Sequence, residues 1–434
     1  MKRVSDLDKM AKLLDEELEV FCGKVFPTLT LPIVRFVKEF CTGMAVAKST
    51  VISRIARAIR PTSAETKTFL NMTSRYLEKR GLDRTFNRAV AHDVGKTVKR
   101  DTLLLMDPTD IVKPFSSGKQ EYIAKVRDGS TGKRHADGYS GCMVAACECG
   151  GKRPRPLWFE LWSSEAPDFV SENDCLIGIL KEVYHATQGK GIVVFDRGAD
   201  RWVLMRELVK MNGRFIIRLV GNRNLIYRGH KRLAKDIAKV CVPTLCTSIT
   251  TRRDGETRKR QLSIGSVTVR LPLANAAERL EMVVVKGFGE EPMMLLTTEL
   301  GTKTQHHLHF ILEAYLTRWR IEDSFRYLKE SYELEDVRLL GYQRLKTLVA
   351  LLGILFAFLA HHLPALGNVI LKTLLTLSKR TTQKLPEFFY YAISDSVSEL
   401  FHYARHHFKK RPRYGIYKPP DDELPLEFPR AAFS

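Results

Sequence analysis

The sequence predicts an α/β protein in which a mixed β-sheet carries helices on both faces and is interrupted by a β-rich insertion. Three observations predict it. Between about residues 100 and 220, β-rich runs give way to apolar strands that alternate with helical stretches. A second group of β-rich runs follows, up to residue 298. The first 80 residues show apolar side chains at helical spacing, which predicts a helical N-terminal domain.

Composition sets limits on the class of protein. The chain has 434 residues, 44% of them hydrophobic, so it can bury a large core spread over about three domains. Eight cysteines occur without a CxxC pair or a histidine at zinc-site spacing, which predicts reduced thiols in a cytoplasmic chain. The N-terminus lacks the apolar core of a signal peptide. The most apolar stretch, residues 348–360, is too short to cross a bilayer comfortably, so we expect a buried core helix and no membrane.

The charge balance favours a polyanionic partner. Lys and Arg number 70 against 49 Asp and Glu, giving a formal charge of +21 and an isoelectric point near 9.6. Cations cluster at residues 252–260 and 405–413, although either run is also compatible with a solvated loop. A basic protein that is indifferent to DNA is the alternative, because phosphate binding needs the charge gathered on one surface.

A basic helix is expected in the N-terminal domain, over residues 46–63. It carries Lys48, Arg54, Arg57 and Arg60. Ser49 or Thr50 is a suitable cap, and Pro61 closes the helix. This segment is equally compatible with a recognition helix that enters a DNA groove and with an amphipathic helix whose basic face is simply exposed to solvent.

The expected strands and helices follow in order. The first β-rich runs are 102–107, 120–128, 138–147 and 156–164, followed by a helix at 171–188 and strands at 191–196 and 215–220. The insertion contains runs at 240–249, 260–271, 280–288 and 293–298. Strands followed by a strand–helix–strand alternation predict a sheet covered on both faces.

One helix after the insertion, residues 312–334, carries a polar stripe. Tyr315, Arg318, Glu322 and Lys329 fall within an arc of about 60°, since each residue turns a helix by about 100°. A carboxylate can hold a divalent metal ion while Arg, Lys and Tyr bind a phosphate beside it. The stripe therefore points to a nucleic-acid backbone.

Two aspartates, Asp107 and Asp196, follow the apolar runs LLLM and IVVF. Ligands bind at strand ends in sheets of this kind. Together with Glu322, they offer oxygen ligands for two Mg²⁺ or Mn²⁺ ions that would drive attack on a phosphodiester. Either aspartate alone is more simply explained as a turn or helix cap.

These residues resemble a known family. The segments MDPTD (106–110) and VVFDRGAD (193–200), with the Tyr, Arg, Glu and Lys pattern above, look like the DDE transposases of bacterial insertion sequences, specifically the IS-four family with its YREK signature. The resemblance spans roughly residues 100–365. It implies a ribonuclease H-like catalytic domain interrupted by the β-rich insertion.

The resemblance also implies a division of the chain. Residues 1–80 would bind transposon ends, 81–222 and 299–375 would form the two parts of the catalytic domain, 223–298 the insertion, and 376–434 a basic region for dimerisation or DNA contacts.

By the same resemblance, Asp107, Asp196 and Glu322 would be the catalytic, metal-binding triad. Tyr315, Arg318 and Lys329 would contact phosphates of the cleaved end. The family excises double-stranded DNA by nicking, hairpin closure, hairpin opening and strand transfer. Its partners would be transposon ends and target DNA, bound by a homodimer that pairs two ends. The resemblance also implies a cytoplasmic bacterial protein associated with the nucleoid.

Two further DNA contacts are expected. Arg218, at the end of the strand 215–220, is a candidate for a backbone contact, with a structural ion pair as the alternative. Relatives use a Trp of the insertion to receive a flipped base, but the four Trp here (Trp158, Trp162, Trp202 and Trp319) lie outside it. Phe288 is the candidate for this stacking role.

Two other functions use the same features. A structure-specific nuclease would cut DNA without strand transfer. An inactive relative would occupy transposon ends and act as a repressor. Three retained carboxylates argue against the repressor, since a pure binding protein has no reason to hold such charges near phosphates.

Overall fold

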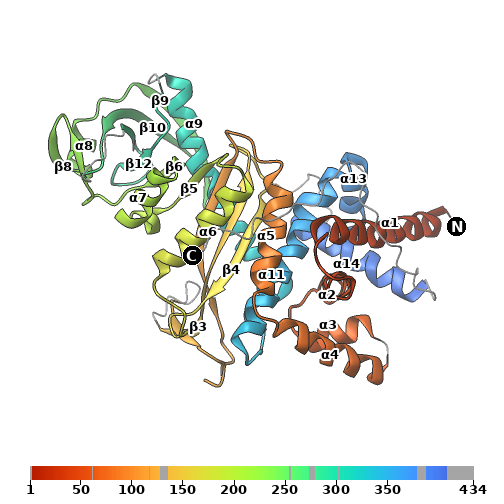
Figure 1. Ribbon diagram of the computed structural model, residues 1–434. Helices are drawn as coiled ribbons and strands as arrows, with labels where there is room; N and C mark the ends of the chain where they lie inside the picture. Colours follow the sequence, from red (N-terminus) through yellow and green to blue (C-terminus); the bar gives the residue numbers. More distant parts are fainter. Residues whose placement is uncertain are drawn as a thin grey trace.

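A ten-stranded mixed sheet forms the centre of the chain, with helices on both faces (Figure 1). The computed structural model describes residues 2–60, 62–116, 118–127, 135–253, 256–272, 279–301, 304–378 and 388–407. The predicted fold class is confirmed, including the helical N-terminal region.

The first part of the sheet contains four strands that pair antiparallel and two further strands that run parallel to the first. Its strands are β1 (Leu103–Val112), β2 (Ala124–Val126), β3 (Ala136–Cys147), β4 (Arg155–Trp162), β5 (Ile192–Phe195) and β6 (Arg214–Arg218). β4, β3 and β1 pair antiparallel, and β5 and β6 then run parallel to β1. This arrangement confirms the mixed sheet expected from the sequence. The run 120–128 yields only the three-residue strand β2.

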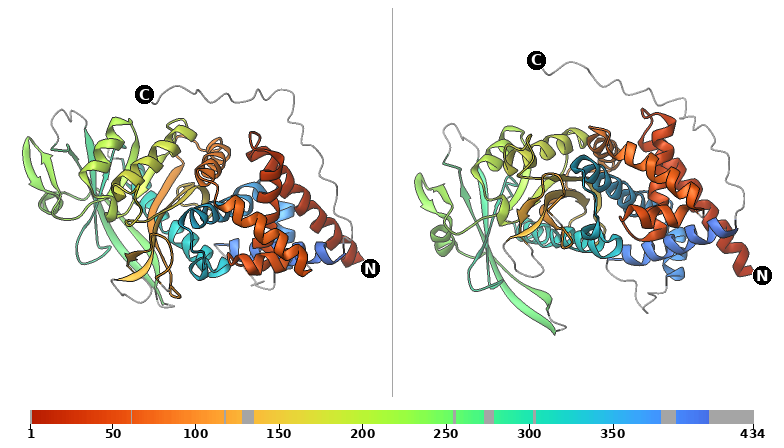
Figure 2. Two further views of the ribbon diagram at one scale, coloured as in Figure 1. Left: turned by 60° about the horizontal axis from the view of Figure 1, so that its bottom comes forward. Right: turned by 90° about the horizontal axis from the view of Figure 1, so that it is seen from below.

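The insertion extends the same sheet. Its strands are β9 (Leu245–Arg253), β10 (Glu256–Val269), β11 (Leu280–Lys286) and β12 (Met293–Thr297). β12 pairs antiparallel with β6, so the strand order continues as β6-β12-β11-β10-β9. The β9–β10 hairpin projects beyond its neighbours (Figure 2). A separate pair, β7 (Asn224–Tyr227) and β8 (His230–Leu233), leads into α8 (Ala234–Val240).

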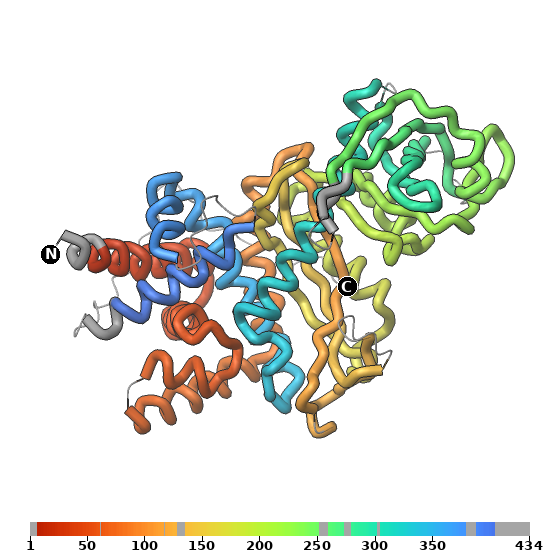
Figure 3. The backbone as a smooth tube through the Cα atoms, turned by 180° about the vertical axis from the view of Figure 1, so that it is seen from behind, coloured from red at the N-terminus to blue at the C-terminus, as the bar shows by residue number. Residues whose placement is uncertain are grey.

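Helices cover both faces of the sheet. α5 (Leu82–Gly95), α6 (Glu172–Ala186) and α7 (Trp202–Lys210) pack on one side, against β4 and β6. α9 (Gln305–Thr317) and α10 (Trp319–Tyr332) cross the other side, where they contact β5, β6, β1 and β3 (Figure 3). The site residues on α9 and α10 are therefore held directly against the strands.

The two ends of the chain form one helical layer. It contains α1 (Lys2–Val25), α2 (Leu31–Ala47), α3 (Ile52–Ile59), α4 (Ser63–Leu77), α13 (Asn368–Leu377) and α14 (Tyr390–His407). α14 packs on α1 and α2, although more than 340 residues separate Lys48 from its ion-pair partner Asp395. The expected cap of the basic helix is wrong, because α3 begins after Val51 without a side-chain cap, while Ser49 hydrogen bonds to Glu333. Pro61 and the basic run 408–413 lie outside the described residues.

A buried helix links the layer to the sheet. α11 (Tyr342–Ala357) contacts β4, α5 and α2. The helical stretch Tyr342–Ala365, which includes the short segments Phe358–His362 and Leu363–Ala365, is long and apolar enough to cross a bilayer by length and composition, but 83% of its apolar window is buried inside the protein. It therefore packs as the core helix expected from the sequence. All eight cysteines are free thiols.

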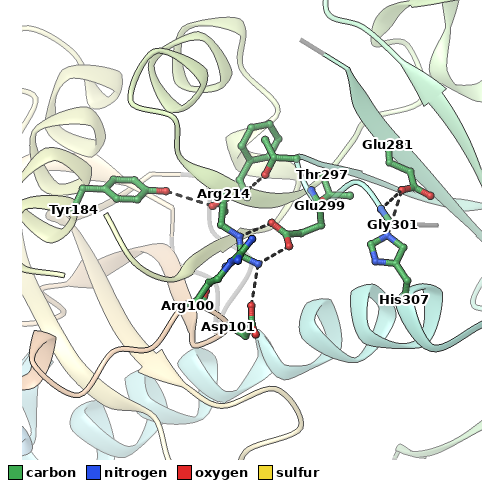
Figure 4. Close-up of polar contacts among 11 residues, drawn as sticks. Arg100, Asp101, Tyr184, Arg214, Glu281, Thr297, Glu299, Gly301 and His307 are labelled. Atoms are coloured by element: carbon green, nitrogen blue, oxygen red, sulfur yellow. Dashed lines mark hydrogen bonds and ion pairs between the residues drawn. The ribbon is translucent and has the colours of Figure 1, made fainter. Parts of the chain in front are cut away.

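A polar cluster holds the starts of the strands together (Figure 4). Arg214, the first residue of β6, donates through Nε and Nη2 to the Glu299 carboxylate at 2.7 and 2.5 Å, and through Nη2 to Asp101 at 3.0 Å. Glu299 follows β12, and Asp101 precedes β1. The cluster thus joins β6 and the start of β1 to the end of β12, at the end of the strands opposite the predicted triad.

Candidate active site

The register of β1 determines where Asp107 lies. β5 pairs with β1 only at Leu103–Leu105, so Asp107 is two residues past the last parallel pair. Beyond that point β1 continues to Val112, paired with β3 on its other side. The expectation that the strand ends at Asp107 is wrong, because β3 extends the pairing. Past Leu105 the edge of β1 that faces β5 is unpaired. Proline, which has no N–H to donate, is tolerated at such an edge, and this explains how Pro108 fits within the strand.

Asp196 follows the last residue of β5, as the sequence predicts. It precedes the short 3₁₀ turn Arg197–Ala199. Since β1 and β5 are parallel neighbours, Asp107 and Asp196 both lie just past the end of their parallel pairing, Asp107 within β1 and Asp196 directly after β5.

The predicted helix 312–334 consists of two helices that meet at Arg318. The backbone N–H of Arg318 bonds to the carbonyl of Tyr315, three residues back, at 3.1 Å. This tighter turn separates α9 from α10. Arg318 and Glu322 nevertheless stay on one side, because their side chains form an i,i+4 ion pair at 2.8 Å.

Arg318 brings the three carboxylates together. Its Nη1 lies 3.5 Å from Oδ2 of Asp107, and its Nη2 lies 4.0 Å from Oδ2 of Asp196 and 2.8 Å from Oε1 of Glu322. The Arg318 side chain is only 4% exposed, whereas the carboxylates are 20%, 36% and 38% exposed. The guanidinium therefore lies beneath an acidic surface that solvent reaches.

The pKa values of the two aspartates shift in opposite directions. Burial is the main cause that raises the pKa of Asp107 to about 7; Arg318 opposes the shift, and Glu322 and Asp196 contribute to it. Burial also acts to raise the pKa of Asp196, but a hydrogen bond from the backbone of Arg197, with Arg318 and Tyr315, lowers it overall. Negative charge at Asp107 is thus poorly compensated, which favours a bound cation.

Tyr315 positions Asp196. Its hydroxyl donates to Oδ1 of Asp196 at 2.9 Å and accepts a hydrogen bond from Nη1 of Arg218 at 3.3 Å. Arg218 is thereby linked to the site from the end of β6. Tyr315 is 1% exposed, so in this conformation it orients a carboxylate and does not face solvent.

Lys329, on α10, contacts β1 three residues beyond Asp107. Its Nζ donates to the carbonyl of Asp110 at 2.8 Å and pairs with Glu335 at 2.9 Å. It borders the acidic group but does not enter it.

The remaining predicted residues lie elsewhere. Lys48 pairs with Asp395 and Arg54 with Glu333, while the exposed Arg57 donates to the carbonyl of Ser53. Phe288 packs partly buried against the core, and its carbonyl accepts a hydrogen bond from Arg260. Within the described residues, no recorded contact joins Phe288 to the three carboxylates.

Two residues near the site escaped the sequence reasoning. Asp200 is 7% exposed and accepts hydrogen bonds from the Val220 N–H at 2.6 Å and from Arg223 Nε at 2.5 Å, which fixes the chain after β6. Asp200 is the last residue of the segment VVFDRGAD, and this position was the sequence signal that could have identified it. Trp319, next to Arg318, is 54% exposed at the start of α10.

The donor set suits a hard divalent cation. Three carboxylates supply only oxygen atoms, which Mg²⁺ and Mn²⁺ prefer. The described part of the chain holds no preformed group of three metal-ligating side chains, and the Arg318 guanidinium lies among the three carboxylates. The Nε of Arg318 is buried without a hydrogen-bond partner, so the guanidinium is not locked in place by a complete set of hydrogen bonds.

The model of the transposase DDE domain matches residues 99–358, more than half of the chain. The chain belongs to this family. DDE transposases are enzymes that use divalent metal ions to act on DNA. The matched range contains both aspartates, the Glu322 helix and the insertion.

The other comparisons add little. No curated protein matches the chain. Among solved structures, the piggyBac transposase synaptic complex with hairpin DNA is similar at 11% identity and a TM-score of 0.42, covering 91% of this chain and 79% of that chain. A likeness this slight does not bear on what this DDE transposase does.

Proposed function

We propose that this DDE transposase is a cut-and-paste enzyme of the IS-four type, which binds transposon ends, cleaves them and joins them to target DNA. One observation carries the proposal: carboxylates from β1, from the residue after β5 and from α10, far apart in sequence, lie within 4.0 Å of a single guanidinium. Charges of like sign gather in this way where a cation is to be held.

Asp107, Asp196 and Glu322 hold two Mg²⁺ or Mn²⁺ ions in this proposal. Such ions activate a water or a 3′-hydroxyl and stabilise the leaving oxygen. Tyr315 keeps Asp196 oriented. Arg318 neutralises the carboxylates and, with Lys329, binds phosphates of the cleaved end, with the planar guanidinium offering two parallel contacts and the ammonium one mobile charge.

The other segments serve DNA binding and pairing. Residues 1–80 recognise the end repeat, with Arg57 the best-placed cation of the basic helix because Lys48 and Arg54 have acidic partners. Residues 81–222 and 299–375 perform the chemistry, 223–298 support the bound end, and 376–434 contribute to dimerisation or DNA contacts. Two subunits pair two ends, and excision proceeds through a hairpin with Phe288 as the stacking residue.

The test uses the full-length protein, a plasmid carrying the DNA that flanks its gene, Mg²⁺ and a target plasmid. We expect insertion products. Cleavage without insertion would instead establish the structure-specific nuclease, and binding without cleavage the end-binding repressor.

Matched variants assign the residues in the same assay. Asp107→Asn, Asp196→Asn and Glu322→Gln should each reduce cleavage at least a thousandfold while end binding stays within a few fold, because phosphoryl transfer loses its metal ligands. Glu330→Gln is the control, since Glu330 lies on the same helix but hydrogen bonds to Tyr391. Full activity in a triad variant would remove that residue from the site.

A further inference from the structure

An uncompensated basic hairpin lies at the outer end of the insertion (Figure 1). We call residues 221–235, which contain β7 and β8, the basic hairpin. Between Glu207 and Asp236 the chain has no acidic residue but eight cations: Lys210, Arg214, Arg218, Arg223, Arg228, Lys231, Arg232 and Lys235. The last four of these belong to the hairpin and to the first turn of α8.

These four cations face solvent without acidic partners. Arg228, Lys231, Arg232 and Lys235 are all exposed, and among the described residues none forms an ion pair. Their neighbours differ, since Arg223 pairs with Asp200 and Lys239 with Asp236. Four unneutralised charges on one small unit repel one another, which is tolerated where a polyanion binds.

The turn presents an arginine at the hairpin tip. Tyr227 and His230 form the last pair of the ladder, so the loop consists of two residues, Arg228 and Gly229. Both have positive φ, 50° and 82°, the pattern of a type I′ turn. Asn, Asp or Gly usually occupies the first position, so Arg228 holds it at a conformational cost. Its guanidinium lies 5.2 Å from the Tyr227 ring centre and is left open to solvent.

The base of the hairpin is held rigidly. Ile226 and Arg270 exchange two backbone hydrogen bonds, of 2.9 and 3.0 Å, which tie β7 to the end of β10. The N–H groups of Ala234 and Lys235 bond to the carbonyls of Arg223 and Gly221 at 2.7 and 3.0 Å. A rigid support reduces the entropy lost on binding.

The hairpin is within reach of DNA bound at the site. Arg218, which is linked to Asp196 through Tyr315, is ten residues from Arg228. A chain spans at most about 3.5 Å per residue, so the tip lies no more than roughly 35 Å away. Duplex DNA rises about 3.4 Å per base pair, so about ten base pairs cover that span. One duplex can therefore occupy the site and contact the hairpin.

We propose that the basic hairpin is a binding surface for the sugar-phosphate backbone of duplex DNA, on the same duplex whose end occupies the active site. This rests on the proposed function, since it takes the substrate to be double-stranded DNA. Arg228, Lys231 and Arg232 contact phosphates and read no sequence, because they lie on an exposed, two-stranded unit with no apolar or amide side chain at the tip.

The test measures the salt dependence of binding to a labelled duplex of about 30 base pairs and arbitrary sequence. The variant combines Arg228→Gln, Lys231→Gln and Arg232→Gln. The control combines Lys96→Gln, Lys99→Gln and Lys190→Gln, which removes three exposed cations without acidic partners among the described residues and gives the same net charge.

Each lost phosphate contact reduces the magnitude of the slope of log K against log salt concentration by about 0.9. The magnitude of the slope should therefore fall by about 2.7 in the hairpin variant and stay unchanged in the control. Equal slopes in the two variants would overturn the proposal. Melting temperatures check that the variants fold. If the triple variant is unfolded, Lys231→Gln alone is measured, and the magnitude of its salt slope should be about 0.9 smaller than that of wild type. Wild-type protein that binds the duplex with this hairpin dependence but never cleaves its gene's flanking DNA would overturn the proposed function and leave the hairpin proposal standing.

Discussion

Arg318 decides the character of the site at the scale of single residues. One buried guanidinium contacts three carboxylates, so only part of their negative charge is neutralised. Asp107 is the most deeply buried of the three side chains and shows the consequence, with a pKa raised to about 7. The site therefore holds stored electrostatic repulsion that a divalent cation would relieve.

Asp107→Asn should stabilise the metal-free protein at about pH 8. The folded-state pKa of Asp107 is about 7, above its ordinary value of 3.8, so between these values the folded state binds more protons than the unfolded state. Ionisation of Asp107 thus removes stability as pH rises through this window, and Asn avoids that loss. We expect a gain on the order of 2 kcal/mol near pH 8 and almost none near pH 4. Denaturant unfolding in EDTA measures it, and a gain that is equal at both pH values would contradict the raised pKa.

At the scale of elements, the site depends on strands fixed at both ends. The carboxylates lie where the parallel pairing of β1 and β5 ends, while the Arg214 cluster joins β6, the start of β1 and the end of β12 at the opposite end. The insertion thereby continues the sheet that carries the two aspartates, and its strand β12 pairs with β6, from which Arg218 reaches Tyr315.

Arg214→Ala should weaken this junction. Arg214 and Glu299 are 21% and 16% exposed, and truncation would leave the Glu299 carboxylate without its main partner. We expect a loss of about 2 kcal/mol in the free energy of unfolding. Lys210→Ala, which breaks an exposed pair with Glu207, is the control and should cost less than about 0.5 kcal/mol. Equal losses would show that the cluster contributes no more than a surface pair.

Sequence periodicity predicted the elements better than their pairing. The stripe on residues 312–334 was visible because helical spacing is local, and it placed Arg318 and Glu322 correctly on one side. The extension of β1 past Asp107 depends on where β3 pairs, which no local pattern contains. The partners of Lys48 and Arg54 were equally hidden, since Asp395 and Glu333 lie in segments hundreds of residues away.

At the scale of the whole molecule, the N-terminal and C-terminal helices form a single layer beside the sheet. α14 packs on α1 and α2, its side chains Ile393, Val397 and Phe401 are buried, and the Ser398 hydroxyl donates to the Val46 carbonyl at 3.0 Å. A segment expected from the sequence to be a separate basic region thus contributes, through α14, to the packing of the proposed end-binding helices.

Phe401→Ala should destabilise that layer. Phe401 is 1% exposed, and loss of a buried Phe costs about 3 to 5 kcal/mol. Limited proteolysis should then cut within α1 and α2 faster than in wild type, because both helices pack on α14. Val369→Ala is the control, since Val369 is 79% exposed on α13. If α1 and α2 are cleaved at the wild-type rate, α14 does not contribute to the stability of these two helices.

Manganese binding tests the central claim most directly, because the three carboxylates are proposed to form one divalent-cation centre. Electron paramagnetic resonance can count bound Mn²⁺ during a titration of the full-length protein with duplex DNA from its gene's flank. The account predicts that wild type and Glu330→Gln bind up to two Mn²⁺ ions per chain. Asp107→Asn, Asp196→Asn and Glu322→Gln should bind fewer Mn²⁺ ions or bind them with much lower affinity. If the three triad variants bind Mn²⁺ with the same stoichiometry and affinity as wild type, the account is contradicted.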